Sequence, residues 1–308
     1  MTDSPTAAHR RLALRQWKSR AMGVLAVGCV AIALLPLGSI LWTCIQLGGP
    51  VLSSNFVFGK EDTFGCPLGT PHCGVGGIGP ALEGTLLLMG LAALMAIPVG
   101  VLAAIYLNEY ARGKVGRTIS FLMDVMSGVP SIVVGVFIFV LFQLYFRQQT
   151  FSAISGAVAL AVIMVPIVTR TAEEALRLVP DHLREAALAL GVPQHQTVRK
   201  VVLRTSLPTL VTGALLAVAR AGGETAPLLF TAFGNPFFPE WNKGIYYVLT
   251  HPVGAIPLLI YNGGLSPWTN QIADAWGASL VIILLMLAIS LLARLALIRR
   301  TKNMMGAG

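Results

Sequence analysis

Charged residues are scarce in this sequence. Of its 308 residues, only 11% are Asp, Glu, Lys or Arg, whereas 55% are hydrophobic; an ordinary soluble domain is roughly 25% charged. The few charges lie between long apolar runs, and a buried helix of a soluble protein seldom holds more than about 14 such residues. The composition excludes an ordinary soluble domain and predicts an all-α, polytopic membrane protein.

The sequence also lacks the motifs of several catalytic and binding classes. It contains no Gly-x-x-x-x-Gly-Lys-Ser/Thr phosphate loop, so any ATP hydrolysis must belong to another polypeptide. All five histidines lie outside the apolar runs, at His9, His72, His182, His195 and His251, which leaves no Ser-His dyad or zinc site within the membrane. The net charge of +9 forms no basic stripe interleaved with aromatics, so we expect no nucleic-acid partner. We predict a protein that is not an enzyme and carries no cofactor or metal.

Long apolar runs predict six membrane spans, at 21–47, 79–107, 118–146, 152–169, 203–232 and 276–298. The first run is too long for a cleaved signal, so we expect it to remain as an anchor. When both termini are placed in the cytoplasm, most of the 22 Lys and Arg residues lie in inner segments, and the outer loops hold only Lys60, Arg147 and Lys243. This asymmetry follows the positive-inside rule and predicts that orientation.

The spans divide the chain into segments of different character. We expect a basic cytoplasmic arm over 1–20, an extracytoplasmic loop over 48–78, a core domain over 79–300 and a cytoplasmic tail over 301–308. The core includes an outer loop over 233–275, whose stretch 251–261 is too short and too broken by proline to cross a bilayer. We interpret that stretch as an interfacial or re-entrant piece.

Two of the four cysteines, Cys66 and Cys73, lie in the first outer loop. The two prolines and the glycine between them turn the chain enough to favour a disulfide, and two free thiols remain the alternative because sequence does not give geometry. His72 beside them would complete only three adjacent metal ligands, so we predict no metal site here.

The cytoplasmic segment 171–191 has a strong helical pattern on both sides of Pro180, and Gly191 then ends it. The pattern predicts two short amphipathic helices. One interpretation is a solvated connector or interfacial anchor. The other is a docking element for a soluble partner, with Glu185 at the contact.

Five ionisable residues fall within or near the spans: Glu83, Asp124, Arg170, Arg220 and Glu224. A charge in mid-membrane costs about 2.5–3.5 kcal/mol, so such residues usually face a bundle interior or a wet cavity. The last two stand four residues apart in the fifth run, on one face of a predicted helix. They either neutralise each other or bind an oxyanion, which a guanidinium matches with two hydrogen bonds. A carboxylate repels a fully ionised oxyanion and accepts a hydrogen bond from a protonated one. Glu224 would therefore help the site to select phosphate, which carries a proton, over sulfate, which does not.

Two motifs resemble known transporter subunits. Glu185-Ala186-Ala187 with Gly191 resembles the Glu-Ala-Ala…Gly motif of permease subunits of ATP-binding cassette (ABC) importers, whose cytoplasmic helix docks onto the ATPase subunit. The Leu-Pro that ends the family pattern is displaced here to Leu207-Pro208. The string Arg220-Ala221-Gly222-Gly223-Glu224-Thr225-Ala226-Pro227-Leu228-Leu229 resembles the signature of A-type permeases of phosphate-specific ABC importers, and segments 76–80, 128–135 and 241–243 agree with it.

This resemblance implies a type I importer permease fold in the plasma or inner membrane, with coupling helices between the fourth and fifth spans. It implies a C-type permease as heterodimer partner, a dimeric ATPase that binds ATP and Mg, an extracytoplasmic phosphate-binding protein and surrounding lipid. We assign the substrate path to Arg220, Glu224, Thr225, Asp124 and Ser131, and ATPase coupling to Glu185, Ala186, Ala187 and Gly191.

Two alternatives stay open. Instead of a phosphate importer subunit, the chain could be an ABC importer permease for another oxyanion or small solute, or it could be a secondary anion transporter. A secondary transporter needs its own ion-coupling groups and usually an internal repeat, and one central charge pair in six spans fits this poorly.

Overall fold

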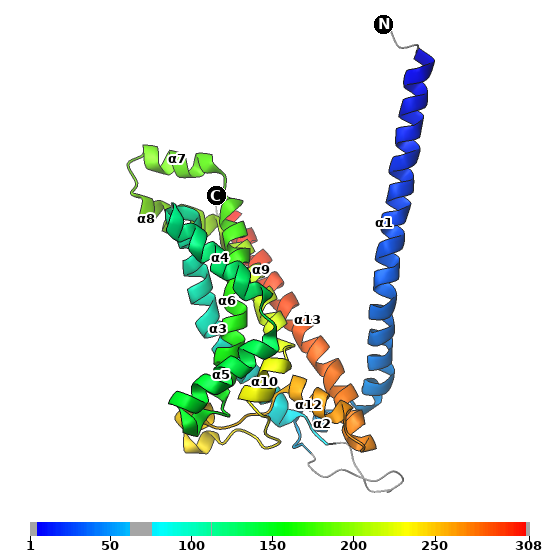
Figure 1. Ribbon diagram of the computed structural model, residues 1–308, viewed down its shortest axis with the longest axis vertical. Helices are drawn as coiled ribbons and strands as arrows, with labels where there is room; N and C mark the ends of the chain where they lie inside the picture. Colours follow the sequence, from blue (N-terminus) through cyan, green and yellow to red (C-terminus); the bar gives the residue numbers. More distant parts are fainter. Residues whose placement is uncertain (1–4, 62–75, 112, 306–308) are drawn as a thin grey trace.

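The computed structural model describes residues 5–61, 76–111 and 113–305, which form a bundle of helices (Figure 1). The long helices are α1 (Pro5–Gly48), α3 (Gly79–Ile105), α4 (Lys114–Gly128), α5 (Ser131–Tyr145), α6 (Ala153–Arg177), α9 (Leu203–Gly222) and α13 (Thr269–Met305). The shorter ones are α2 (Ser54–Phe58), α7 (Asp181–Ala189), α8 (Gln194–Thr197), α10 (Ala226–Thr231), α11 (Ile245–Thr250) and α12 (Ile256–Gly264). Cys66 and Cys73 lie outside the described residues.

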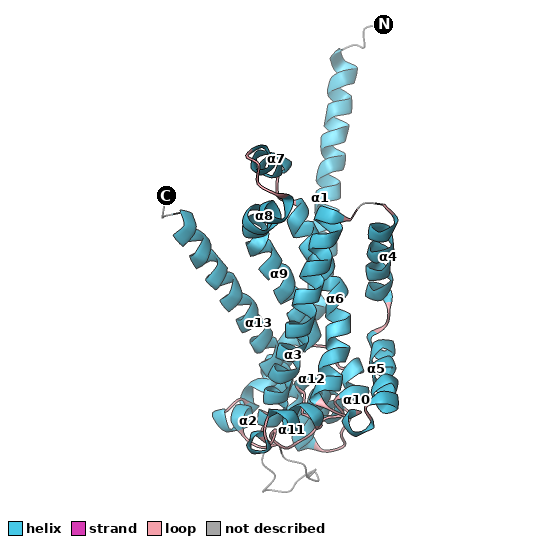
Figure 2. Ribbon diagram, turned by 90° about the vertical axis from the view of Figure 1, so that its left-hand side faces the viewer, coloured by secondary structure: helices cyan, strands magenta, loops and turns pink. Residues whose placement is uncertain are grey.

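The helices run between two distinct ends. The start of α1, the end of α13, and α7 and α8 lie at one end, whereas α2, α11 and α12 lie at the other (Figures 1 and 2). In the described part of the chain, five helices are long and apolar enough to cross a membrane, and the bent pair α4 and α5 makes a sixth span if counted as one. The predicted number of spans and the common side of the two termini agree with this arrangement.

The third predicted span, 118–146, is not continuous. α4 and α5 meet at an angle of 103°, across Val129 in an extended conformation (φ −72°, ψ 129°) and Pro130. Proline disfavours a helical conformation in the residue before it and has no N–H for the helix ladder. The predicted span is therefore present as a bent pair of helices, and the chain turns sharply at Pro130.

The fifth predicted span, 203–232, is also broken. The helical run starts earlier, at Gln194, and ends at Gly222; the separate helix α10 follows after residues 223–225, with a proline in its first turn. Proline alone does not decide where a helix breaks, because Pro98 and Pro166 lie inside the continuous helices α3 and α6.

Two predicted boundaries near the end that carries α7 also differ. Residues 171–177 continue α6 rather than forming a separate helix, so α7 is the one separate helix of segment 171–191. α1 runs from Pro5 without a break at residue 20, and the arm predicted over 1–20 continues into the first span.

The core is built from small side chains that let helices approach closely. α3 and α6 lie side by side (Figure 1), and their interface is rich in alanine together with Leu88, Leu160 and Met164. A Cβ atom on Gly100 would lie only 2.7 Å from the Cβ of Val168. Close backbone approach is the usual source of helix association in lipid, where burial of apolar side chains gives little drive.

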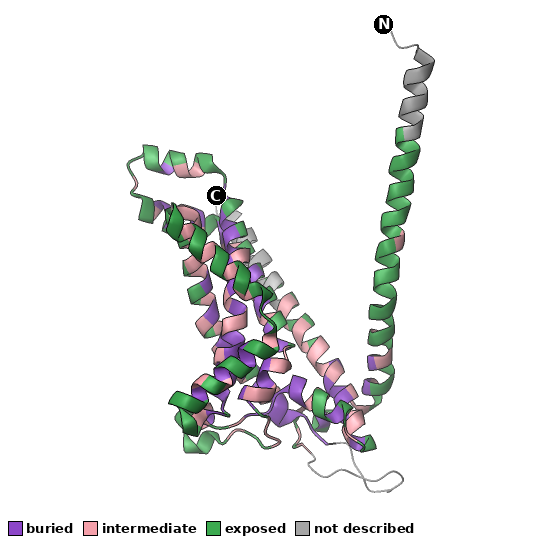
Figure 3. Ribbon diagram, in the orientation of Figure 1, coloured by how far each residue is buried: buried purple, intermediate pink, exposed green. Residues whose placement is uncertain are grey.

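Helix α1 stands away from the bundle along most of its length (Figure 3). Its described side chains are mostly exposed until Cys44, which is buried, and Gly48, where an added Cβ would clash with the backbone of Trp276 in α13. An apolar helix exposed on every side faces lipid or another membrane subunit.

The packing of α5 on α10 gives a test of the fold. A Cβ on Gly135 would lie 2.5 Å from the Cα of Pro227, so Gly135→Val should overpack this contact at a cost of about 1–3 kcal/mol. We expect the thermal midpoint of the purified protein to fall by about 3–9 °C. The control is Gly128→Val, because a Cβ there would meet no described heavy atom within 4 Å. Equal midpoints for the two variants would contradict the close contact.

Candidate functional site

A hollow of about 300 Å³ lies where the broken third span meets α6 and α9. We call it the Arg220 hollow; its lining residues include Ser127, Pro130, Ser131, Ile163 and Arg220. The structure thus brings Arg220 and Ser131, two residues predicted for the substrate path, to one space.

Two groups that attract anions border the Arg220 hollow. The Arg220 side chain is 61% exposed and borders the hollow without being enclosed by protein. Ser131 begins α5, and the first N–H groups of a helix have no partner within the helix and carry partial positive charge. A guanidinium and a helix N-terminus at one hollow are the elements of an oxyanion site.

Glu224 lies next to Arg220, although the two are not on one helix as predicted. α9 ends at Gly222, and the chain turns once through Gly223, whose N–H donates to the carbonyl oxygen of Arg220 at 3.1 Å. Arg220 Nε and Glu224 Oε1 are 3.7 Å apart, and the Glu224 side chain is only 17% exposed. The carboxylate therefore partly neutralises the charge of Arg220, while the guanidinium stays accessible from the hollow.

Thr225 directly precedes α10, which is held against α5. The carbonyl oxygen of Thr225 accepts hydrogen bonds from the N–H groups of Leu228 and Leu229 at 3.1 and 3.2 Å, and α10 packs closely on α5 at Gly135. Two helix breaks, one at Pro130 and one at residues 223–225, thus lie near each other in space. Broken helices of this kind commonly line substrate sites in transporters.

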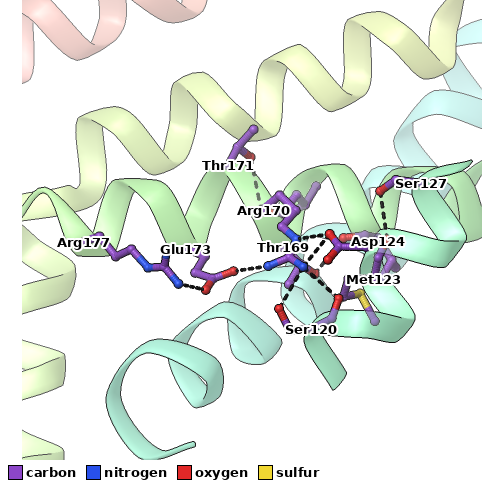
Figure 4. A network of polar contacts seen from close by, with 11 residues as sticks. Ser120, Met123, Asp124, Ser127, Thr169, Arg170, Thr171, Glu173 and Arg177 are labelled. Atoms are coloured by element: carbon purple, nitrogen blue, oxygen red, sulfur yellow. Dashed lines mark hydrogen bonds and ion pairs between the residues drawn. The ribbon is translucent and has the colours of Figure 1, made fainter. Parts of the chain in front are cut away.

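Asp124 is placed differently from the other predicted path residues, because it pairs with Arg170 of α6 (Figure 4). Arg170 Nη2 lies 2.5 Å from Asp124 Oδ1 and donates to the carbonyl oxygen of Ser120 at 2.7 Å, while Nη1 donates to Glu173 at 2.7 Å. Glu173 is buried and also pairs with Arg177. This Arg170 network ties α4 to α6. Asp124 does not line the Arg220 hollow, and its path role stays a prediction.

Part of this network could be predicted from residue spacing. The spacing of Arg170, Glu173 and Arg177 at i, i+3 and i+7 places them on one helical face. Asp124 and Ser120, however, lie on α4, about 50 residues earlier, and no local pattern links them to Arg170.

Three of the predicted coupling residues, Glu185, Ala186 and Ala187, lie on α7, which projects from one end of the molecule (Figure 1). Leu183 and Ala187 face the body of the protein, and Glu185, on the opposite side of the helix, is exposed together with Ala186. Gly191 follows the helix in a left-handed conformation (φ 78°) that favours glycine. The N–H groups of Gly191 and Val192 donate to Leu188 and Ala187 carbonyl oxygens at 2.9 and 3.1 Å, which closes the helix end.

Glu83, one of the five ionisable residues in the predicted spans, has a local partner. Its carboxylate, on α3, accepts a hydrogen bond from the indole N–H of Trp241. The contact fixes the short turn at 241–243 to the bundle, which is a structural role.

A second hollow, of about 260 Å³, lies at the end of the molecule opposite α7 and contains Glu61, Asn262, Gln271 and Asp274. Burial raises the pKa of the Glu61 carboxyl to about 7, and the Asp274 carboxylate adds to the rise. This hollow shares no lining residue with the Arg220 hollow, so it is a separate feature.

Residues 96–298 match the family described as "Binding-protein-dependent transport system inner membrane component". This chain belongs to that family. Its members are transport components, so the chain is a multi-pass membrane transport subunit and not an enzyme, as the sequence predicts.

Individual members of the family show similarity over most of the chain. "Phosphate transport system permease protein PstA" of Haemophilus influenzae is 38% identical over 291 residues, covering 94% of this chain and 97% of the relative. The protein of the same name from Xylella fastidiosa is 40% identical over 225 residues, covering 73% and 76%. "Phosphate transport system permease protein PstA 1" of Mycobacterium tuberculosis is 38% identical over 265 residues, covering 85% and 83%.

Solved structures of ABC importers share the fold of this family member. A chain of a bacterial alginate ABC transporter aligns with a TM-score of 0.57 at 17% identity, covering 92% of this chain and 94% of that one. A chain of the MetNI methionine ABC transporter in an inward-facing conformation aligns with a TM-score of 0.56 at 18% identity, covering 71% and 94%. At such identities the likeness concerns the fold alone, and it confirms the predicted type I importer permease fold.

Proposed function

We propose that this chain is the permease subunit of an ATP-driven importer of inorganic phosphate and forms half of its translocation path. The observation that carries the proposal is Arg220, an open guanidinium at a hollow between two broken spans, with Glu224 beside it. Phosphate at neutral pH carries both negative charge and a proton, so it suits an arginine and a carboxylate acceptor together. The names of the relatives support the same substrate.

The partners follow from the chemistry that this chain does not supply. We propose that a dimeric ATPase, which binds ATP and Mg, docks on the exposed face of α7 around Glu185 and Ala186. A C-type permease would complete the path as a heterodimer, and a phosphate-binding protein would deliver substrate at the end that carries α11 and α12. The end with α7 and both termini faces the cytoplasm in this proposal, in agreement with the positive-inside rule.

The proposal is tested by phosphate uptake into vesicles that hold this chain with its co-purifying subunits and the binding protein. We expect uptake with ATP, none with a non-hydrolysable ATP analogue, and no competition from excess sulfate. Uptake without ATP hydrolysis would favour a secondary anion transporter. Equal competition by sulfate would favour a permease for other oxyanions.

A further inference from the structure

The guanidinium of Arg184 joins α7 to the body of the protein. Its side chain is only 17% exposed although α7 projects from the molecule. Nη1 donates to the carbonyl oxygen of Val179 at 2.6 Å, and Nη2 donates to that of Leu176 at 2.8 Å. Leu176 lies in the last turn of α6 and Val179 lies two residues beyond the helix end at Arg177. Basic side chains near a helix C-terminus commonly donate to its last carbonyl oxygens. One side chain of α7 thus caps α6.

The same guanidinium also reaches the end of α3. Nε and Nη2 donate to Glu109 Oε1 at 3.3 and 3.1 Å, and the Glu109 side chain is 8% exposed. Glu109 belongs to a π-helical turn, Tyr106–Tyr110, that continues α3. Its backbone carbonyl oxygen accepts a hydrogen bond from Gln194 Nε2 of α8 at 2.9 Å. Both α7, through Arg184, and α8, through Gln194, therefore contact Glu109.

These contacts reach the Arg220 hollow through well-packed elements. α6 is tied to α4 by the Arg170 network, and α4 ends at the break whose residues, Val129 and Pro130, line the hollow. α3 packs closely on α6, because a Cβ on Gly100 would lie 2.7 Å from the Cβ of Val168, and close-packed interiors transmit strain. A displacement of α7 has a continuous path of ion pairs and packed helices to the hollow.

We propose that Arg184 and Glu109 form the joint through which movement of α7 is transferred to α3 and α6. Both are positioning residues, since neither touches substrate or ATP, and the inference rests on the proposed docking of the ATPase on α7. Apolar contact of Leu183 with the cluster around Leu176 and Val179 holds α7 near the body. The hydrogen bonds of the Arg184–Glu109 pair have a fixed geometry, so they transmit the displacement of α7 to α3 and α6.

The test measures ATP hydrolysed per phosphate imported by the whole complex in vesicles. Glu109→Gln keeps the shape of the side chain and removes the charge, and Arg184→Lys keeps the charge and removes the fork of donors. Residues that couple two sites change coupling by factors of about 2 to 30. We expect each variant to assemble, to hydrolyse ATP within about twofold of the unmodified rate, and to raise the ratio about tenfold. The double variant should be no worse than either single one, because the pair acts as one unit.

Asp181→Asn is the matched control, since Asp181 touches the same guanidinium at 2.8 Å but lies on α7 itself and is 89% exposed. The Asp181→Asn complex should hydrolyse as many ATP molecules per phosphate imported as the unmodified complex. If Glu109→Gln lowers the yield of complex, Glu109→Asp, which retains the charge, should assemble and give an intermediate ratio. Assembled variants with the unmodified ratio would overturn the joint. Absence of ATP-dependent phosphate uptake by the unmodified complex would instead overturn the proposed function.

Discussion

Phosphate uptake should fall at least about 100-fold when Arg220 is replaced by glutamine, with the complex still assembled. The guanidinium borders the hollow and is 61% exposed, so it contributes little to packing. Hydrogen bonds from a charged group contribute about 1.5–3 kcal/mol each, and loss of two of them, about 3 kcal/mol, corresponds to a factor of about 100. The measurement is the initial rate of radiolabelled phosphate uptake into vesicles.

Two further variants sharpen this prediction. Arg220→Lys keeps the charge but not the planar fork, and we expect it to retain more uptake than Arg220→Gln. Arg147→Gln removes an exposed arginine in the short turn after α5, away from the hollow, and should leave the rate unchanged. An assembled Arg220→Gln complex with normal uptake would mean that Arg220 and Glu224 only neutralise each other.

The scarcity of charge and the length of the apolar runs were enough to predict the spans α1, α3, α6 and α13, because each is a continuous helix whose hydropathy decides its place in lipid. The end of α7 just before Gly191 was also predictable, since a left-handed residue after a helix favours glycine. These features depend on local sequence and on the solvent.

The broken spans were not predictable in the same way. Of the prolines in the predicted spans, Pro130 and Pro227 lie at breaks, whereas Pro36, Pro98, Pro166 and Pro208 lie within helices. The difference depends on tertiary contacts such as that of Gly135 with Pro227. The pairing of Arg170 with Asp124 likewise joins residues 46 positions apart, which spacing along one helix does not reveal.

Glu224 shows why a wrong helix boundary can leave a site prediction useful. The predicted i, i+4 pair needs one continuous helix, but α9 ends at Gly222. Because the chain makes only one turn at Gly223, the two side chains remain 3.7 Å apart. The pairing therefore depends on the turn at Gly223 and not on a continuous helix.

Reversing the charge of Glu185 should separate the ATPase from the permease. Glu185 is exposed on the side of α7 opposite Leu183 and Ala187, so Glu185→Lys leaves the packing of α7 on the body intact. Disrupting one partner of a buried interfacial charge pair costs about 2–5 kcal/mol, which weakens docking by a factor of about 30 or more. We expect uptake to fall in proportion, whereas the ATPase continues to hydrolyse ATP without transport.

The measurement combines phosphate uptake, ATP hydrolysis and retention of the ATPase on an affinity-tagged permease. Glu174→Lys provides a matched control, because Glu174 is an exposed glutamate on the last turns of α6, at the same end of the molecule as α7. If both variants behave alike, the effect comes from added positive charge near the membrane and not from docking. If Glu185→Lys retains the ATPase and couples normally, α7 docks through other residues or serves as a connector, and the joint at Arg184 loses its proposed source of movement.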